Sequence, residues 1–520
     1  MENKLEVRHG EMVREMSPAS LAAKNGQNDP GKFGRMFPAL PALKIGDDAL
    51  FDLALAMKDA TPSDPVGDNP LIPAGFTYLG QFVDHDITLD LTPLEQQRED
   101  PFSTTNFRTP GLDLDALYGS VPQLTPYIFQ RDAATFKQST KLIVGKAAPS
   151  PDIRNGGAPD IPELPNDLPR SSHGRAILGD ERNDENRFVG QTHLAFIKFH
   201  NAIVDRLGNG SGALRGQELF KEARRIATWH YQWIVLFDFI ERLTEPGLIK
   251  KIKHDGRRFY RFRSRPYIPV EFAAAAYRLG HSMVRENYNY NRVFGPPGGP
   301  PATLNFLFNF TGKSGTIVGD LAAQDIGPPN TPMKRLPSNW VIDWRRFFDF
   351  NTPAEPGFAL NPTRLIDPAV VPQLHTLPGE ANREAVLPFR NLRRGVILGL
   401  PSGQSIARAM GIPPLTGDEI ATDSAGSNDA AAAKRNKLHT ETPLWYYILK
   451  EAKLIHGGKR LGPIGSTIIA ETFLGLVHGD QESFMFRRTN WTPELPRKDQ
   501  DNFTMVDLLN FVGDINPLGP

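Results

Sequence analysis

The segment Tyr78-Leu-Gly-Gln-Phe-Val-Asp-His-Asp-Ile-Thr88 joins an apolar run to a histidine with an acid on each side. A core helix seldom carries three adjacent ionisable groups, because each of them is costly to bury. Taken alone, Asp84, His85 and Asp86 also fit the solvated end of a helix. The rest of the chain must therefore decide whether His85 has a chemical role.

The composition is that of a globular protein with a large core. Of the 520 residues, 40% are hydrophobic and 9% aromatic, and Lys+Arg and Asp+Glu both number 59. The zero net charge offers no basic surface for nucleic acid or for an anionic membrane. Because the chain has no cysteine, disulfides, thiolate metal sites and cysteine nucleophiles are excluded. A transition metal would need histidine or carboxylate ligands, or a cofactor to carry it.

No targeting or membrane segment is expected. Residues 1–21 are polar and lack the apolar centre of a secretory signal, and nowhere do 18 apolar residues follow one another. We therefore expect a cytoplasmic location by default, although export by a route without an N-terminal signal stays open.

Helical periodicity dominates the rest of the chain. Apolar residues recur at spacings of three and four, and two-residue alternation is scarce. We expect helices at 190–207, 217–244, 270–284, 442–457 and 465–478. Long Pro/Gly-rich connections are expected at 148–171, 294–302, 325–338 and 352–378.

The predicted fold class is mainly α, with little β structure and one large domain. The polar, Ala-rich residues 423–437 are predicted to form a mobile loop. We expect an N-terminal extension over residues 1–40 and the main domain over residues 41–520.

A second polar segment is Arg108-Thr-Pro-Gly-Leu-Asp-Leu-Asp-Ala-Leu-Tyr-Gly-Ser120, in which oxygen-bearing positions alternate. Alternate residues of an extended backbone point the same way, so such oxygens can converge on a hard cation such as Ca²⁺. The candidate ligands are Thr109, Gly111, Asp113 and Asp115, with Asp86 as a further one. An acidic turn without an ion fits the pattern equally well.

A third segment, Gly179-Asp-Glu-Arg-Asn-Asp-Glu185, places Arg182 among acids and amides just before a predicted helix. It fits either a salt-bridged helix start or a positioned cation. His193 and His200 lie seven residues apart on one face of that helix. A zinc pair is one interpretation of them, and two buried histidines that each have their own hydrogen-bond partners is the more common one.

Two further segments complete the set. Tyr277-Arg-Leu-Gly-His-Ser-Met-Val284 places His281 beside Gly280, where a flat group could approach the backbone, although a lone histidine on an apolar helix is often core filler. The stretch from Leu387 to Arg394, followed by Gly-Leu-Pro at 399–401, by itself resembles an ordinary loop–helix junction. No nucleophile elbow, zincin motif or P-loop competes with these segments.

In this order, the five segments resemble the animal-type haem peroxidases, the peroxidase–cyclooxygenase superfamily that includes myeloperoxidase. The segments run from Gln81 to Pro401, which is most of the chain. The resemblance implies a single, mostly helical catalytic domain around a buried haem, and we expect a bacterial-type member.

The resemblance also implies a role for each matching residue. Gln81, His85 and Arg182 become the catalytic residues on the peroxide side of the haem. His281 becomes the proximal iron ligand, Asn391 its hydrogen-bond partner and Arg394 the partner of a haem propionate. The calcium ligands become Asp86, Thr109, Gly111, Asp113 and Asp115. At two of these positions the chain departs from the family pattern, which has Phe where Gly111 stands and Ser where Asp115 stands.

The implied cofactors are haem b and Ca²⁺. In some relatives, acids at the positions of Asp84 and Glu185 form ester bonds to haem methyl groups, and both acids are present here. Ester-linked haem is therefore a hypothesis. Asn186 stands where myeloperoxidase has a sulfonium-forming methionine, so that third link is not expected.

The implied activity is peroxidation by hydrogen peroxide through a ferryl iron and a porphyrin radical. The expected electron donors are small: halides, pseudohalides and phenols. The partners are thus small molecules, and the sequence does not indicate an oligomeric state. A haem-dependent fatty-acid dioxygenase of the same superfamily is the first alternative, but Arg278 stands where those enzymes need a tyrosine, and Tyr277 is one place too early. A non-catalytic haem-binding or adhesion protein is the second alternative.

Overall fold

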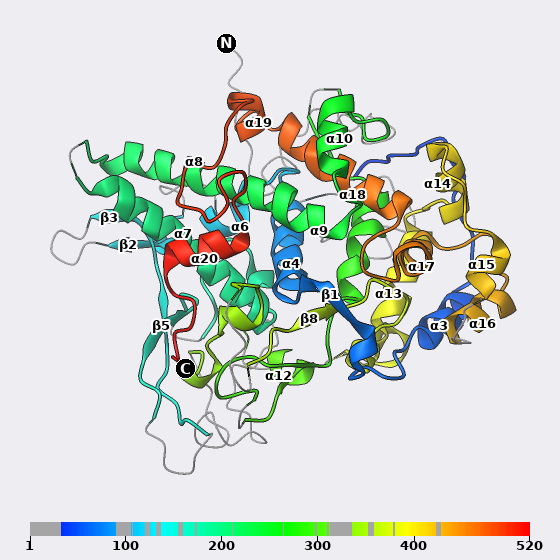
Figure 1. Cartoon of the computed structure of the whole chain (residues 1–520), viewed down its shortest axis with the longest axis horizontal. Coiled ribbons are helices and arrows are strands. Elements are labelled where there is room, and N and C mark those ends of the chain that lie inside the picture. Colours follow the sequence, from blue (N-terminus) through cyan, green and yellow to red (C-terminus); the bar gives the residue numbers. More distant parts are fainter. Residues whose placement is uncertain are drawn as a thin grey trace.

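The computed structural model describes residues 33–519 apart from several short segments and one longer one (Figure 1). The residues outside the description are 1–32, 90–105, 107, 120–124, 132–136, 154–159, 172–173, 211, 264, 297–298, 309–310, 312–334, 352–357, 378–379, 423–427 and 520.

Helices make up most of the regular secondary structure in the described residues, which confirms the mainly α prediction. In chain order the α-helices are α3 Asp47–Ala56, α4 Gly75–Ile87, α6 Asp115–Tyr118, α7 Arg187–Gly208, α8 Gly216–Ile234, α9 Glu241–Leu243, α10 Leu248–Asp255, α11 Val270–Ala273, α12 Leu304–Phe308, α13 Leu387–Ile397, α14 Gly403–Met410, α15 Gly417–Ala421, α16 Asn428–Arg435, α17 Leu444–His456, α18 Pro463–Gly479, α19 Phe484–Arg487 and α20 Met505–Val512. A π-helical stretch, η5 Val235–Ile240, joins α8 to α9.

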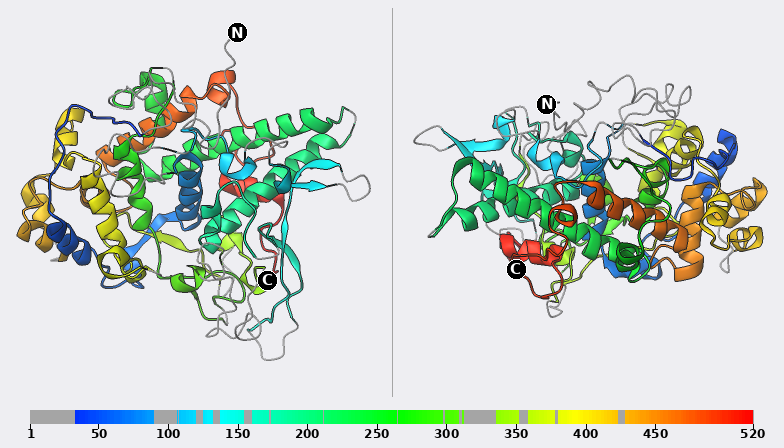
Figure 2. Two further views of the ribbon diagram at one scale, coloured as in Figure 1. Left: turned by 180° about the vertical axis from the view of Figure 1, so that it is seen from behind. Right: turned by 90° about the horizontal axis from the view of Figure 1, so that it is seen from above.

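The strands in the described residues form only two-stranded antiparallel sheets. The pairs are β1 Asp68–Pro73 with β8 Pro362–Arg364, β2 Phe129–Arg131 with β3 Gln138–Leu142, β4 Gly145–Ala147 with β5 Leu164–Asp167, and β6 Asn287–Tyr288 with β7 Ala302–Thr303. These sheets lie around the helical body, and the β2–β3 hairpin contacts α7 and α8 near the edge of the molecule (Figure 2).

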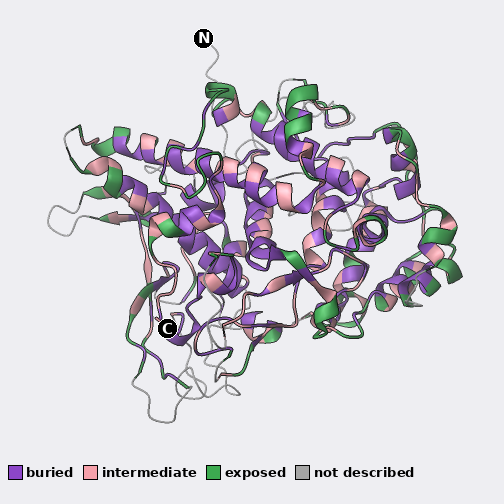
Figure 3. Ribbon diagram, viewed as in Figure 1, coloured by how far each residue is buried: buried purple, intermediate pink, exposed green. Residues whose placement is uncertain are grey.

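Helix α4 stands at the centre of the molecule, and its apolar side packs on α7 (Figure 1). Leu79, Phe82 and Val83 are completely buried, and the Phe82 ring stacks on Phe196 of α7 with 4.8 Å between centroids. The helices around α4 are buried over most of their surface (Figure 3). The polar residues of α4 are therefore held by a rigid apolar frame.

Four of the expected helices are present with nearly the expected bounds. They are α7 for 190–207, the α8–η5–α9 run for 217–244, α17 for 442–457 and α18 for 465–478. Each has a strong apolar pattern, and each buries that pattern against neighbouring helices.

The expected helix at 270–284 is wrong in its continuity. The structure has α11 Val270–Ala273, a break, and then a 3₁₀ helix, η6 Ala276–His281. At the break Ala275 leaves the helical region, with φ −136° and ψ −74°. The Arg278 side chain donates through Nε to the Ala273 carbonyl, 3.0 Å away, so an arginine satisfies the carbonyl freed at the end of α11. A local side-chain contact thus accompanies a break that the helix preference of the alanines does not predict.

The expected mobile loop at 423–437 is also wrong where the structure describes it. Residues 423–427 lie outside the described residues, but Asn428–Arg435 form α16. Asp429 of α16 is buried and accepts hydrogen bonds from Tyr446 (2.7 Å) and Lys450 (3.1 Å) of α17. The alanines give this helix a small buried face, and the buried ion pair fixes it to α17.

The body of the molecule begins before residue 41. Phe33, Met36 and Phe37 are buried, and the backbone amides of Met36 and Phe37 donate to the buried Glu271 carboxylate, both at 3.0 Å. The last residues of the expected extension therefore pack on the domain, while residues 1–32 lie outside the described residues. Among the described helices, none combines the length and the apolar character needed to cross a membrane.

Candidate active site

Helix α4 brings the candidate residues together. It contacts α6, the 3₁₀ helix η4 Glu181–Asp184, and η6, the elements that carry the expected cation loop, Arg182 and His281. Gln81 and Asp84 on α4 stay partly exposed, whereas His85 and Asp86 are buried.

His85 is held through one ring nitrogen. Its Nδ1 lies 2.8 Å from Oδ1 of Asn183, an oxygen that can only accept, so Nδ1 carries the proton and Nε2 has the free lone pair. Burial lowers the pKa of His85 below its usual value, and the positive charge of Arg182 lowers it further. His85 is therefore neutral at neutral pH, with Nε2 as a base.

Asn183 was not singled out in the sequence, and it links two histidines. Its Nδ2 lies 2.9 Å from Nδ1 of His193, while its Oδ1 faces His85. His200 instead lies 3.0 Å from the Tyr118 hydroxyl and 2.9 Å from the Thr140 carbonyl. The two histidines of α7 therefore have separate partners, which supports the interpretation as buried, satisfied histidines rather than a zinc pair.

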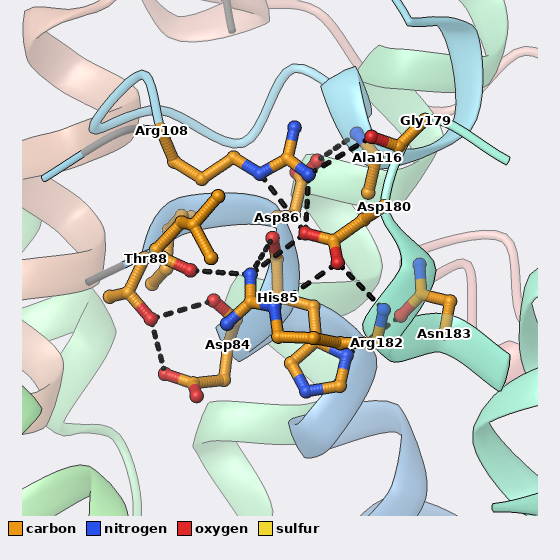
Figure 4. A network of polar contacts seen from close by, with 12 residues as sticks. Asp84, His85, Asp86, Thr88, Arg108, Ala116, Gly179, Asp180, Arg182 and Asn183 are labelled. Carbon is orange, nitrogen blue, oxygen red and sulfur yellow. Dashed lines mark hydrogen bonds and ion pairs between the residues drawn. The ribbon is translucent and has the colours of Figure 1, made fainter. Parts of the chain in front are cut away.

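Arg182 lies beside His85 at the end of α4 (Figure 4). Its Nη2 donates to the carbonyls of His85 (3.0 Å) and Thr88 (2.6 Å). Its Nε and Nη2 also donate to the carboxylate of Asp180, at 3.1 and 2.8 Å. The expected pairing of Arg182 with the histidine segment is thus present, and Asp180 is a second residue that the sequence reading missed.

Glu185 and Gln81 lie on the partly exposed side of the polar residues around His85. The Gln81 amide donates to Glu185 Oε1, which also lies 3.6 Å from Nε2 of His85. Asn186 donates to Gln81 Oε1 at 2.8 Å and caps α7 through the Val189 amide. Asp84 accepts from the Thr88 hydroxyl at 3.0 Å. Because Gln81, Asp84 and Glu185 are all partly exposed, this side faces open space.

His281 lies on η6, which contacts α4. The Asn391 side chain of α13 approaches its Nδ1 to 2.8 Å. The nearest amide atom is Nδ2 rather than the expected Oδ1, and a half-turn of the amide exchanges the two. Burial lowers the pKa of His281 to about 3, and the charges of Arg278 and Arg390 add to the effect. The imidazole is neutral, as a metal ligand requires.

A hydrogen bond ties the two sides together. The Tyr277 hydroxyl on η6 donates to the Gly80 carbonyl on α4 at 3.0 Å. Tyr277 precedes His281 by four residues, and Gly80 precedes His85 by five. Two segments almost two hundred positions apart in the chain therefore meet beside the expected haem site.

The residues around His281 fit a flat cofactor. A side chain at Gly280 would meet nothing within 4 Å, so there is room beside the histidine. A small apolar pocket adjoins Asn391 and is lined by residues that include Ala274, Leu392, Gly395 and Trp445. The donor set is a neutral imidazole in an apolar wall, which suits a haem iron. Arg394 is partly buried on α13, one turn after Asn391.

The expected calcium residues lie together, held by direct contacts. Asp86 accepts from the amides of Leu114 (3.1 Å) and Ala116 (3.2 Å), and Arg224 lies 3.5 Å from Asp115. Burial and the charge of Asp113 raise the pKa of Asp86 to about 8. Thr109 donates to Asp115 at 3.4 Å, and the Gly111 amide donates to the Thr109 carbonyl. Among the described residues, no three histidines or acids are arranged to hold a metal.

The sequence matches the family model for animal haem peroxidase over residues 88–301. This part of the chain is therefore similar to the animal haem peroxidases. The matched region contains Arg182, His281 and the loop from Thr109 to Asp115, whereas His85 and Asn391 lie outside it.

Curated proteins similar to this chain include Heme peroxidase 2 of Caenorhabditis elegans, which is 25% identical over 61% of the chain and 41% of the relative. Human dual oxidase 1 is 24% identical over 96% of the chain and 30% of the relative. The chain thus spans less than half the length of these relatives.

Two solved structures have the same fold. Peroxidase A from Dictyostelium discoideum aligns over 96% of both chains with a TM-score of 0.59 and 16% identity. The fatty acid alpha-dioxygenase of Oryza sativa aligns over 94% of this chain and 80% of its own, with a TM-score of 0.56 and 14% identity.

Proposed function

We propose that this protein is a haem-dependent peroxidase that uses hydrogen peroxide to oxidise halides, pseudohalides and small phenols. One observation carries the proposal. Two neutral histidines, each contacted at Nδ1 by an asparagine, lie on elements joined by the Tyr277–Gly80 hydrogen bond. When bound, the haem supplies the iron that takes up peroxide and stores its two oxidising equivalents.

His85 moves the proton. Its Nε2 accepts the proton of the near peroxide oxygen and delivers it to the far oxygen, which leaves as water. Asn183 keeps Nδ1 protonated during this transfer, so the ring has one basic nitrogen at all times. Arg182 lies beside His85, keeps its charge throughout, and stabilises the negative charge that develops on the leaving oxygen.

His281 holds the iron through Nε2. This role requires the proton on Nδ1 and Oδ1 of Asn391 as its acceptor, so the Asn391 amide takes the half-turned orientation in the holoenzyme. A neutral amide oxygen accepts the Nδ1 proton of His281 more weakly than a carboxylate would, so the imidazole ring gains less negative charge. With this neutral partner, His281 would leave a bound iron at a reduction potential that favours halide oxidation.

Ca²⁺ is part of the same proposal. The ion would be held by Asp86, Asp113 and Asp115, with oxygens of Thr109 and Gly111. The support is the burial of Asp86 close to the partly buried Asp113, because a cation between the two acids would offset their repulsion. Asp86 follows His85 directly, so the ion would fix the catalytic base rather than react.

The electron donor and the haem linkage need their own tests. With peroxide present, we expect both halogenation of monochlorodimedone and oxidation of guaiacol. Guaiacol turnover without halogenation would exclude halides as electron donors.

Ester links through Asp84 and Glu185 are expected to leave the haem in the protein after acid–acetone extraction. Free, unmodified haem in the extract would exclude them.

The fold resemblance to a fatty acid alpha-dioxygenase makes that activity the second candidate. Arg278 stands where those enzymes need a tyrosine. The hydroxyl of the neighbouring Tyr277 donates a hydrogen bond to the Gly80 carbonyl. Its ring stacks on Phe272 with 4.8 Å between the centroids. We therefore expect no oxygen uptake with linoleate when peroxide is absent, and uptake would favour the dioxygenase.

An absorption spectrum before and after one equivalent of peroxide tests the main proposal. We expect a Soret band that shifts within milliseconds, and a His85→Leu variant that binds haem but reacts about 10³-fold more slowly. The exposed His478 on α18 provides the control, as His478→Leu should react normally. No Soret band after expression with haem would refute the proposal, and haem binding without any peroxide reaction would favour a non-catalytic haem protein.

A further inference from the structure

Asp180 lies between two arginines (Figure 4). Arg108 donates to its Oδ2 through Nε, at 3.1 Å, and through Nη2. Arg182 donates to the other side of the same carboxylate, through Nε to Oδ1 and through Nη2 to Oδ2. The side chains of Arg108 and Asp180 are each 3% exposed, and that of Arg182 is 18% exposed. Water therefore contributes little to holding this cluster.

The cluster of Arg108, Asp180 and Arg182 contacts the last turn of α4. Arg182 donates to the His85 and Thr88 carbonyls, and Asp180 holds Arg182. On the opposite side, Asn106 donates to the Ile87 carbonyl at 3.0 Å and accepts from the Arg108 amide at 3.2 Å. The last turn of α4 is thus bound both by Arg182 and by the segment that carries Arg108.

Arg108 fixes Asp180 more firmly than Arg182 alone could. It also donates from Nη2 to the Gly179 carbonyl at 3.2 Å, so Arg108 binds both the side chain of Asp180 and the carbonyl of the preceding residue. A carboxylate held by two guanidinium groups has its position set from both sides. If Arg108 were lost, Asp180 would turn with Arg182, and the pair could swing away from His85.

We propose that Arg108 is a positioning residue for Arg182: by anchoring Asp180 it keeps the Arg182 guanidinium beside His85, where anions meet the haem iron. The inference rests on the proposed function, because it assigns a task to Arg182 at that site. Arg108 directly precedes Thr109, so the same contact connects the expected cation loop to the peroxide side of the haem.

Azide and imidazole binding to the full-length ferric holoenzyme tests this inference. Azide is an anion that needs the Arg182 charge, whereas imidazole is neutral. We expect Arg182→Gln to weaken azide binding by at least tenfold and Arg108→Gln to weaken it several-fold, with imidazole affinity unchanged in both. In the Arg182→Gln background, Arg108→Gln should have less than a twofold effect, because Arg108 acts through Arg182.

Arg175→Gln is the matched control, since Arg175 pairs with Glu181 at 2.7 Å on the exposed side of the same segment. It should leave both affinities unchanged. The inference is overturned if Arg108→Gln binds azide normally, weakens imidazole equally, or keeps its effect in the Arg182→Gln background. A wild-type chain that binds no haem would instead refute the proposed function.

Arg108→Lys covers the case in which Arg108→Gln does not fold. A single ammonium cannot grip both Asp180 and the Gly179 carbonyl as the guanidinium does, so Arg108→Lys should weaken azide binding about threefold and spare imidazole. Unchanged azide affinity, or a loss that persists without Arg182, overturns the inference for this variant as well.

Discussion

Asn183 decides which nitrogen of His85 is basic. Its amide has one oxygen for His85 and one NH₂ group for His193, so both rings are set by the same side chain. Without the amide oxygen, the proton of His85 could move to Nε2 and remove the base. A residue that never touches peroxide thus controls the proton transfer.

Replacing Asn183 with Leu should therefore slow the reaction with peroxide by 10- to 100-fold while haem content stays normal. Stopped-flow absorption at the Soret band measures the rate. Asn201→Leu is the control, because Asn201 also uses its amide within the fold, on Leu142 at the far end of α7. A normal rate in Asn183→Leu would show that His85 keeps its tautomer without help.

In the proposed site, Asn391 would tune the iron through the neutrality of its amide. Asn391→Asp would place a carboxylate against His281, push electron density onto the iron, and lower the ferric/ferrous reduction potential by tens of millivolts. Spectroelectrochemistry measures the potential, and Asn391→Gln is the neutral control. An unchanged potential in Asn391→Asp would mean that Asn391 does not contact the proximal ligand in the holoenzyme.

At the scale of elements, α16 depends on one buried ion pair. Asp429 accepts from both Lys450 and Tyr446 of α17, and the Lys450 side chain is completely buried. A buried ammonium that loses its carboxylate partner is strongly destabilising.

Asp429→Ala should thus lower the free energy of unfolding by about 3–5 kcal/mol. Urea unfolding followed by circular dichroism measures the loss. Asp418 on the neighbouring α15 is exposed, and Asp418→Ala should change stability by less than about 0.5 kcal/mol. Equal stability of the two variants would show that apolar packing alone holds α16.

At the scale of the whole molecule, buried neutral histidines make the fold sensitive to acid. Burial lowers the pKa of His200 to about 4 and that of His230 to about 3. The Nε2 of His230 accepts from the amides of Glu494 and Leu495, so this ring must be neutral to hold the C-terminal segment. The unfolded chain binds these protons below pH 6.5 and the folded chain does not, so stability falls as the pH drops from 6.5 toward 3.

Glu451 has the opposite effect on stability. Burial raises its pKa to about 8, so the folded chain binds this proton more readily, and stability rises as the pH drops from 8 to 4.5.

The variant His230→Gln separates the contribution of His230 to the pH dependence of stability from that of Glu451. His230→Gln can still accept from the two amides but cannot titrate. Between pH 7.5 and pH 5, wild type should lose about 2 kcal/mol of stability relative to His230→Gln. Urea unfolding at the two pH values measures this difference, and the exposed His254→Gln is the control. A constant difference would mean that His230 is protonated in the folded state.

The sequence by itself determined the helical class and the set of segments that form the site. Apolar periodicity is local, so α7, α8, α17 and α18 could be predicted with nearly their observed bounds. The resemblance of the five ordered segments to the haem peroxidases singled out His85, Arg182 and His281, and the structure brings their elements into contact with α4 or places them on it.

Only the tertiary structure decided which side chains hold these residues. Asn183, Asp180 and Arg108 have no distinctive sequence pattern, because their roles depend on contacts between segments that are far apart in the chain. The helix at Asn428–Arg435 was also missed, since it is held by a buried lysine on α17. The break at Ala275 was missed because apolar periodicity does not show where a local side-chain contact replaces a helical one. Local propensity differs by less than about 1 kcal/mol per residue, so a few such contacts outweigh it.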